Sequence, residues 1–452
     1  MTEPQQATPA STAAPAPVSF REALGWWTKL GFISFGGPAG QIAIMHRELV
    51  EKRRWISERR FLHALNYCMV LPGPEAQQLA TYIGYLLHGT KGAIAAGVLF
   101  VLPSLLILAA LSWLYLAFGH VAAVQDVLWA VKPAVVAIVL HAAWRIGSRT
   151  LKHPLLAGIA LAAFLALALA DAPFPLVIAG AALTGVIAHR VAPLAFAATG
   201  GHGGATSAPH APALIDDHTP VPPHARYRSG ALVKTVAVFL LLWLGTMALL
   251  VAGGGWQSTL AQMGLFFSQA ALLTFGGAYA VLPYVTDAAV NHYHWATTAQ
   301  MLDGLALGET TSGPLIMIVA FVGFVGGWTQ QLHEITVLGA LAGAGVATFF
   351  TFLPSFLFIL AGVPLVEATR HDLRIGAPLL AITAAVVGVI LHLALFFAQH
   401  VFWPASTPAA QGAPDPGAMA IATIAFIALW RFDQSVLRVI GACALAGLAV
   451  AC

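Results

Sequence analysis

Two apolar stretches near the start of this chain are interrupted by glycine and proline, and these breaks constrain the fold more than any other feature. The first reads SFGGP at residues 34–38, and the second reads LPGPE at residues 71–75. Proline removes a backbone N–H and clashes with the preceding helical turn, and glycine adds backbone freedom. In lipid the freed groups find no water, so broken backbone persists only where protein buries it or where it lines a cavity. The two breaks therefore predict a site.

The breaks also favour a particular ligand chemistry. Pro38 and Pro74 stand where a new helix can begin, because proline fits the first helical turn. Free N–H groups at a helix start carry partial positive charge and attract an anion. The alternative is that the glycines only kink helices or let them pack closely. We assign the anion site of the first half to Gly36, Gly37, Pro38, Gly73, Pro74, Gln77 and Lys132.

Two of these residues contribute side chains rather than backbone. Gln77 offers a neutral hydrogen bond to an oxyanion. Lys132 lies inside the apolar run 127–146 and either neutralises a dianion or snorkels to the interface.

The same pattern returns later in the chain. FGG at 35–37 recurs at 275–277, an offset of 275 − 35 = 240, and the Gly-Pro pair at 73–74 recurs at 313–314. LPS at 102–104 recurs at 353–355, an offset of 353 − 102 = 251. Constant offsets indicate a tandem duplication, and matching broken segments in two halves are a strong pointer to a transporter site. The second-half candidates are Gly276, Gly277, Gly313 and Pro314.

On these residues the chain resembles the chromate ion transporter family in its long, two-domain form. The motifs that carry the resemblance are SFGGPAGQ (34–41), the basic loop with Trp55, LPGPEAQQLATYIGY (71–85) and TFGGAYAVLPYV (274–285). The resemblance covers residues 20–190 and 255–450. It implies secondary transport of chromate, most often efflux that gives chromate resistance. Chromate is a tetrahedral dianion like sulfate, so uptake or exchange of sulfate or another small oxyanion is the alternative.

The second copy departs from the first at its second break. It reads TSGP at 311–314, so one proline is missing, and Leu315 stands where the first copy has Glu75. This difference leaves open how much the second half contributes to the site.

Composition supports a membrane protein independently. The chain is 59% hydrophobic and 9% charged, whereas soluble domains carry about 25% charged residues. Several apolar runs exceed the roughly 18 residues that indicate a spanning helix. We expect an all-α integral membrane protein with about thirteen apolar segments, including helices broken by glycine and proline that re-enter the membrane.

Charge sets the expected orientation. The loop 47–60 is rich in Lys and Arg, whereas the equivalent loop 287–300 contains neither. By the positive-inside rule the first loop is cytoplasmic, so the two halves form inverted-topology repeats. If the broken segments instead span the membrane fully, the basic loop lies outside, which we disfavour. The expected location is the cell (inner) membrane, with the N-terminus cytoplasmic and the C-terminus external.

The domain organisation follows from these patterns. We expect a disordered tail at 1–19, a first repeat at 20–191, a Pro/Gly/His-rich cytoplasmic linker at 192–230, a connecting helix at 231–252 and a second repeat at 255–452. In the linker, histidines and aspartates could chelate a metal, but their irregular spacing favours a disordered connector. These residues are His202, His210, Asp216, Asp217, His218 and His224.

Two carboxylates are candidates for proton coupling. Glu75 and Glu309 adjoin the two second breaks, and a carboxylate at membrane depth is a functional candidate. The expected partners are chromate or sulfate, a coupling proton or anion, and the lipid bilayer. We expect no nucleic acid and no cofactor, and a homodimer is left open. The chain has no G-x-x-x-x-G-K-[ST] loop, and an enzyme would need a nucleophile–base pair or metal cluster that we do not find.

Overall fold

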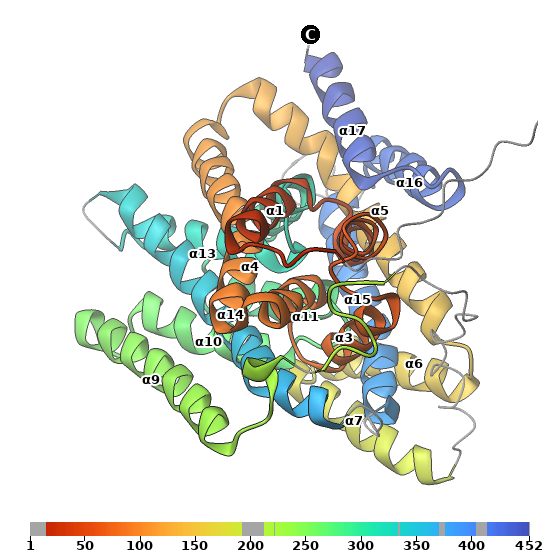
Figure 1. Cartoon of the computed structure of the whole chain (residues 1–452). Helices are drawn as coiled ribbons and strands as arrows, with labels where there is room; N and C mark the ends of the chain where they lie inside the picture. The colour runs from red at the N-terminus through yellow and green to blue at the C-terminus, as the bar shows by residue number, and fades with distance from the viewer. Residues whose placement is uncertain are drawn as a thin grey trace, which may run out of the picture.

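The computed structural model describes residues 15–191, 212–220, 222–332, 335–369, 376–403 and 414–451 (Figure 1). Within these ranges the secondary structure is helical, apart from one isolated β-bridge. The expected all-α class is therefore confirmed.

The first half begins with short helices separated by breaks and continues with longer apolar helices. Its elements are α1 (Phe20–Ile33), α2 (Gly37–His46), η1 (Arg47–Lys52), α3 (Glu58–Val70), α4 (Glu75–Phe118), α5 (Ala122–Thr150), α6 (Pro154–Ala170) and α7 (Phe174–Val191). The connecting region contains η2 (Pro223–Ala225) and α9 (Ser229–Gly254).

The second half follows the same order of elements. They are α10 (Thr259–Leu273), α11 (Ala278–Asp287), η3 (Ala288–His292), α12 (Thr298–Thr310), η4 (Leu315–Met317), α13 (Ile318–Thr329), α14 (Thr336–Thr369), α15 (Gly376–Phe402), α16 (Pro416–Arg431) and α17 (Val436–Ala451). Local details repeat as well: Ser57 caps α3 and Thr297 caps α12, an offset of 297 − 57 = 240.

Five helices in the described part of the chain are long and apolar enough to cross a membrane: α4, α5, α9, α14 and α15. Side chains point outward around α9, where Val233, Leu241 and Leu249 are each at least 67% exposed. A helix that is apolar all round and unburied by protein is suited to lipid, and α9 lies at the edge of the molecule (Figure 1). The chain is a multi-pass membrane protein.

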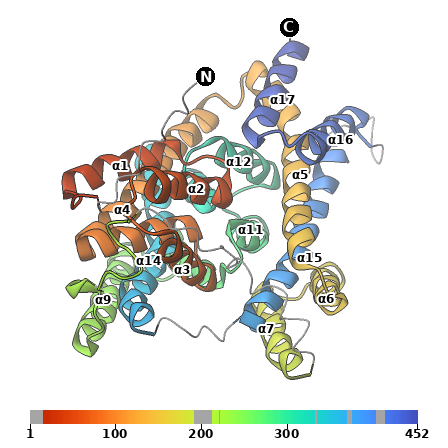
Figure 2. The same ribbon diagram turned by 45° about the vertical axis from the view of Figure 1, so that its right-hand side comes forward.

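The short helices α2, α11 and α12 occupy the middle of the molecule (Figure 2). α4 packs against α14 on one side, α5 packs against α15 on the other, and α2, α11 and α12 lie between these pairs (Figure 2). A helix of about 10–15 residues is roughly 15–22 Å long, less than the roughly 30 Å of a bilayer core. The broken helices therefore end inside the structure.

The helix α4 turns back on itself about a third of the way along its length, at His88 and Gly89. His88 and Gly89 leave the helical conformation, and Gly89 has a φ of 63°. The two arms then pack closely, because a Cβ on Gly84 would lie 2.5 Å from the Gly92 carbonyl oxygen. The second half repeats this contact between α13 and α14, where a Cβ on Gly323 would lie 2.4 Å from the Gly343 carbonyl oxygen. Small residues thus allow the close helix contacts typical of membrane proteins.

Part of the linker packs against the basic loop of the first half. The Leu214 N–H donates to the Arg54 carbonyl (2.9 Å), and the Ile215 N–H donates to the Trp55 carbonyl (3.0 Å). The Ser57 hydroxyl donates to Asp217 at 2.6 Å. Residues 212–220 are therefore an ordered strap and not the disordered connector expected from composition, because backbone pairing holds them. His202 and His210 lie outside the described residues.

The first helix begins at Phe20, and the two residues before it form hydrogen bonds. Ser19 caps α1 by accepting the Glu22 N–H, and the Val18 carbonyl accepts a hydrogen bond from His88 Nε2 (2.9 Å). Val18 is thus bonded to α4, whereas Ser19 caps its own helix.

The packing of the strap, residues 212–220, against the first half predicts the effect of one substitution. Ile215 is buried against the first half, so Ile215→Asp should release residues 212–217 and speed hydrogen exchange of their amides. His218→Ala is the matched control, because the His218 side chain is exposed in the same strap. Exchange measured by mass spectrometry that is equal in both variants would contradict the packing described here.

Candidate functional site

Glycines with positive φ mark every predicted break. They are Gly36 (87°), Gly37 (68°), Gly73 (123°), Gly276 (78°), Gly277 (96°) and Gly313 (99°). These angles are open to glycine and strained for other residues. A new helix begins after each break: α2 at Gly37, α4 at Glu75, α11 at Ala278 and η4 at Leu315.

The breaks of the two halves are joined by a pair of reciprocal hydrogen bonds. The Gly73 N–H donates to the Thr274 carbonyl at 2.7 Å, and the Gly313 N–H donates to the Ser34 carbonyl at 2.8 Å. The donors are separated by 313 − 73 = 240 residues, and the acceptors by 274 − 34 = 240. Each half therefore supplies the carbonyl that the other half's break needs. We call this meeting point the crossing.

Glutamine side chains hold the crossing together. Gln41 Nε2 donates to the Gly313 carbonyl (2.6 Å) and to the Ser34 carbonyl (3.2 Å), so it bridges the halves. Gln78 Nε2 donates to the Pro72 carbonyl (2.8 Å) within the second break. The predicted residue Gln77 is buried beside them and donates to Thr81 (3.0 Å).

Glycine at the two second breaks is required by space as well as by φ. A Cβ on Gly73 would lie 2.5 Å from Ser355 Oγ, and one on Gly313 would lie 2.8 Å from Ser104 Cβ. The serines are related by the second sequence offset, 355 − 104 = 251. Both breaks thus receive a serine from the opposite half.

Buried polar atoms without partners surround the crossing. The hydroxyls of Ser104 and Ser312 and the amide oxygens of Gln41, Gln77 and Gln78 form no hydrogen bond with the described part of the chain. All five side chains are at most 1% exposed. An unsatisfied buried polar group costs roughly 1–3 kcal/mol, so this cluster is unusual. The Ser104 and Ser312 hydroxyls are donors available to an anion, although the crossing is closed to solvent here.

The two predicted carboxylates lie in different surroundings. Glu309 is in contact with the Tyr279 hydroxyl, which donates to it. Glu75 is partly buried at the start of α4, and no hydrogen bond or ion pair to its side chain is found among the described residues. Both follow the positions expected from sequence, directly beside the second breaks.

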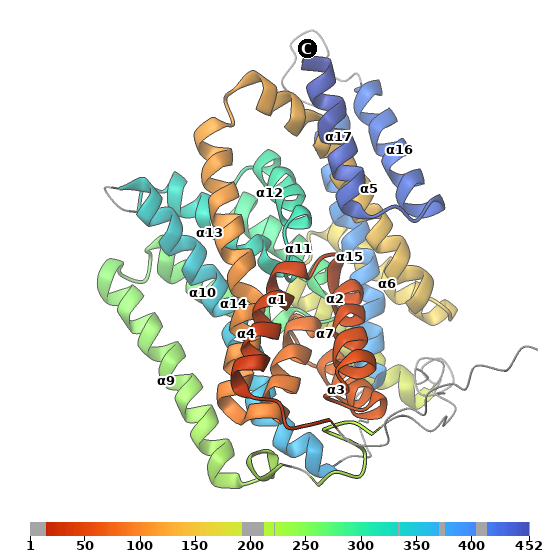
Figure 3. The ribbon, with the colours of Figure 1, turned by 45° about the horizontal axis from the view of Figure 1, so that its top comes forward.

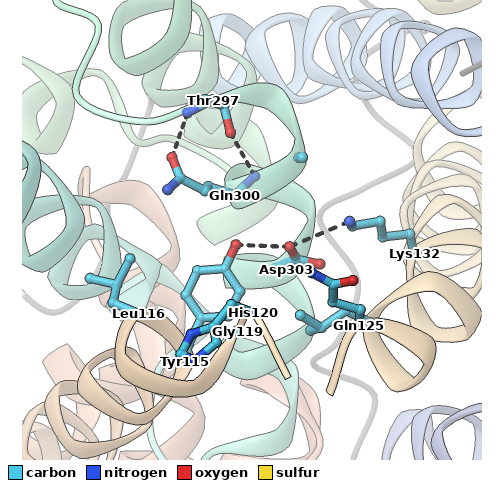
Figure 4. Close-up of a pocket in the computed structure, with 11 residues that line it drawn as sticks. Tyr115, Leu116, Gly119, His120, Gln125, Lys132, Thr297, Gln300 and Asp303 are labelled. Atoms are coloured by element: carbon cyan, nitrogen blue, oxygen red, sulfur yellow. Dashed lines mark hydrogen bonds and ion pairs between the residues drawn. The ribbon is translucent and has the colours of Figure 1, made fainter. Parts of the chain in front are cut away.

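Lys132 lines a separate pocket near the ends of α4 and α12 (Figure 4). Its ammonium lies 3.6 Å from Asp303 Oδ2, and the Tyr115 hydroxyl donates to the same oxygen at 2.9 Å. Sequence reasoning missed Asp303, although a carboxylate within an apolar segment was a signal of the kind used for Glu309.

A second buried charged cluster joins α3 to α14. The Arg60 guanidinium lies 3.2 Å from Glu367, and the Tyr82 hydroxyl donates to Glu367 at 2.7 Å. Arg60 belongs to the basic loop 47–60, yet its side chain is only 7% exposed. Its burial follows from the start of α3, which turns this residue inward.

Metal binding finds no support in the part of the chain that the structure describes. No group of three or more His, Cys, Asp or Glu side chains is placed to hold an ion there. The linker residues Asp216 and Asp217 instead bond to the strap and the basic loop.

Comparison with known proteins agrees with the sequence motifs. The model of the chromate transporter family matches residues 22–186 and 261–448. A chromate transport protein of Pseudomonas aeruginosa is 33% identical over 98% of this chain and 96% of its own length. A chromate transport protein of Cupriavidus metallidurans is 30% identical over 88% of each chain. An uncharacterized transporter of Methanocaldococcus jannaschii is 24% identical over 83% of each. No solved structure matches this chain.

The crossing predicts which glycines cannot be replaced. Gly73→Ala and Gly313→Ala should each lower stability by about 1–3 kcal/mol, because the methyl group meets a serine at a strained φ. Gly158→Ala is the control, since its Cβ would meet open space within helix α6. The measurement is thermal unfolding of the purified protein in detergent. Equal unfolding temperatures for all three variants would show that the crossing is not tightly packed.

Proposed function

Because this chain belongs to the chromate transporter family, we propose that it carries chromate across the membrane and binds it at the crossing. Membership confirms the expected family, and its named relatives are transport proteins rather than enzymes. The observation that carries the proposal is the cluster of buried, unpartnered polar groups between the two Gly-Pro breaks.

The chemistry of the crossing suits a tetrahedral oxyanion. The start of α4 at Glu75 directs partial positive charge toward its break. At the other break, a single 3-10 turn at Leu315 leads into α13. The Ser104 and Ser312 hydroxyls add neutral donors, which strengthen when they bond to a charged acceptor. Sulfate has the same charge and shape and can accept the same hydrogen bonds, so it is the second candidate substrate.

The closed crossing requires a conformational change for loading. Its polar side chains are at most 1% exposed, so an anion reaches them only after the halves separate on one side. We propose that the halves are inverted repeats that open alternately. The reciprocal bonds support this relation, and so do the positions of the matching helices α3 and α12, which lie toward opposite ends of the molecule (Figure 3).

The proposal also covers the direction of chromate transport and the carboxylates that couple it to protons. We propose export across the inner membrane, giving chromate resistance, because the basic loop 47–60 would concentrate anions at the cytoplasmic face. Glu75 and Glu309 are the proposed coupling carboxylates beside the breaks. A homodimer is not required by this site, because one chain supplies both breaks.

The first test concerns the two free hydroxyls. Ser104→Ala and Ser312→Ala should each weaken chromate transport by about tenfold, the effect of losing one hydrogen bond to a charged group. Ser112→Ala is the matched control, because this buried serine on the same helix already donates to the Leu108 carbonyl. The measurement is radiolabelled chromate flux in reconstituted vesicles, repeated with sulfate as competitor. Parental flux in both variants would remove the crossing as the binding site.

The second test concerns orientation. Cysteines introduced at Ser57 and Thr297, the equivalent helix caps, should react with impermeant reagents from opposite faces, with position 57 cytoplasmic. We expect this because the loop 47–60 is rich in Lys and Arg, whereas the equivalent loop 287–300 contains neither. Labelling of both positions from one face would exclude inverted repeats.

A further inference from the structure

A pocket lies between the ends of α4, α5 and α12 (Figure 4), and no residue of either second break lines it. Its volume is about 460 Å³, which is ample for a small hydrated oxyanion. Lys132 reaches into it from α5, and Asp303 faces Lys132 from α12 (Figure 4). The rest of the lining combines the polar side chains of His120, Gln125, Thr297 and Gln300 with apolar residues such as Leu116 and Leu128.

The pocket contains the ammonium group of Lys132 and the carboxylate of Asp303, whose opposite charges largely cancel. Asp303 is 4% exposed and Lys132 is 27% exposed, and their closest atoms are 3.6 Å apart. The Tyr115 hydroxyl also donates to Asp303. While Asp303 is ionised, the positive charge of Lys132 is largely neutralised, and an anion entering the pocket would meet the nearby carboxylate.

We propose that this pocket is an anion-binding site on the face opposite the basic loop, where exported anion leaves, and that its occupancy is linked to protonation of Asp303. A proton from solvent binds the Asp303 carboxylate, the Lys132 ammonium keeps its own protons and loses its counter-ion, and the incoming oxyanion takes that place. Proton and anion then bind together, and each raises the affinity for the other by the same factor. The inference rests on the proposed transport function and adds a site distinct from the crossing.

The groups that can act on Asp303 are few. Lys132 on α5 and Tyr115 on α4 touch it, and His120 lines the same pocket. The packed elements α13 and η4 carry no titratable side chain. The other neighbours of α12, α15 and α17, bring groups that do not line the pocket: His392, His400, Arg438 and Cys443.

The site differs from the carboxylates beside the breaks. Glu309 is held by Tyr279, and no cation is paired with Glu75 or Glu309 among the described residues. Only at Asp303 does the described structure combine a buried carboxylate, a lysine and an open pocket. Neutralising this carboxylate would therefore release a positive charge where an anion can reach it.

The experiment measures chromate binding to the purified protein by calorimetry across a range of pH. Chromate itself takes up a proton near neutral pH, so each variant is compared with the parent at the same pH, which cancels the change in the anion. Asp303→Asn mimics the protonated carboxyl. It should bind chromate more tightly than the parent at high pH, by a factor in the range of about 5 to 150 that is typical of linked sites. The difference should disappear at low pH.

Two further variants separate this linkage from a structural role. Tyr115→Phe removes a donor that stabilises the ionised carboxylate, so tight binding should persist to higher pH. Lys132→Gln should weaken chromate binding most at low pH, because protonation of Asp303 there leaves the Lys132 ammonium free to pair with the anion. Asp126→Asn is the matched control, because this carboxylate on α5 does not line the pocket; it should follow the parent.

The outcomes distinguish the two proposals. Failure of the parent to bind or carry chromate overturns the proposed function. If the parent carries chromate but Asp303→Asn and Tyr115→Phe keep the parental pH profile, the proton-linked anion site is overturned while transport stands. If Asp303→Asn does not fold, the Tyr115→Phe profile decides: a shift to higher pH supports the linkage, and an unchanged profile rejects it.

Discussion

A broken backbone at membrane depth must find its hydrogen bonds within protein, and this requirement organises the structure. Gly73 bonds to the Thr274 carbonyl and Gly313 to the Ser34 carbonyl, so each half completes the other. The bonds also hold four interrupted segments at one place. Gln41 reinforces the same contact by bonding both halves. The remaining unpartnered hydroxyls are then left for a ligand, and the backbone geometry determines where they lie.

Close packing of small residues allows the crossing to form. The second break of each half leads into a short helical arm that folds back on a long helix, at Gly84 and Gly92 in α4 and at Gly323 and Gly343 between α13 and α14. Larger residues at these contacts would separate the arms and move both breaks. In lipid, association of helices depends on packing and hydrogen bonds more than on the hydrophobic effect. The same glycine contacts therefore determine both the stability of the protein and the geometry of the crossing.

Sequence reasoning predicted the parts of this structure that depend on local backbone chemistry. The breaks and the repeated order of helices follow from glycine, proline and a constant offset, whereas the positive φ angles of the glycines are a finding of the structure. Contacts between side chains distant in sequence were missed, including Lys132 with Asp303 and Arg60 with Glu367. The bridging role of Gln41 was missed for the same reason, although it lies within a recognised motif. Such contacts depend on how helices meet, which no local pattern encodes.

The reciprocal bonds have a consequence for how the protein is made. During synthesis the Gly73 N–H enters the membrane long before its acceptor, the Thr274 carbonyl, has been made. Likewise, the Ser34 carbonyl is made long before its donor, the Gly313 N–H. The first half must therefore remain incompletely paired, with its second break sheltered by water, lipid headgroups or the insertion machinery. Only after residue 313 has been synthesised and inserted can both bonds close. Assembly of the crossing is thus a late step of biogenesis, and a half made alone would keep its buried donor unsatisfied.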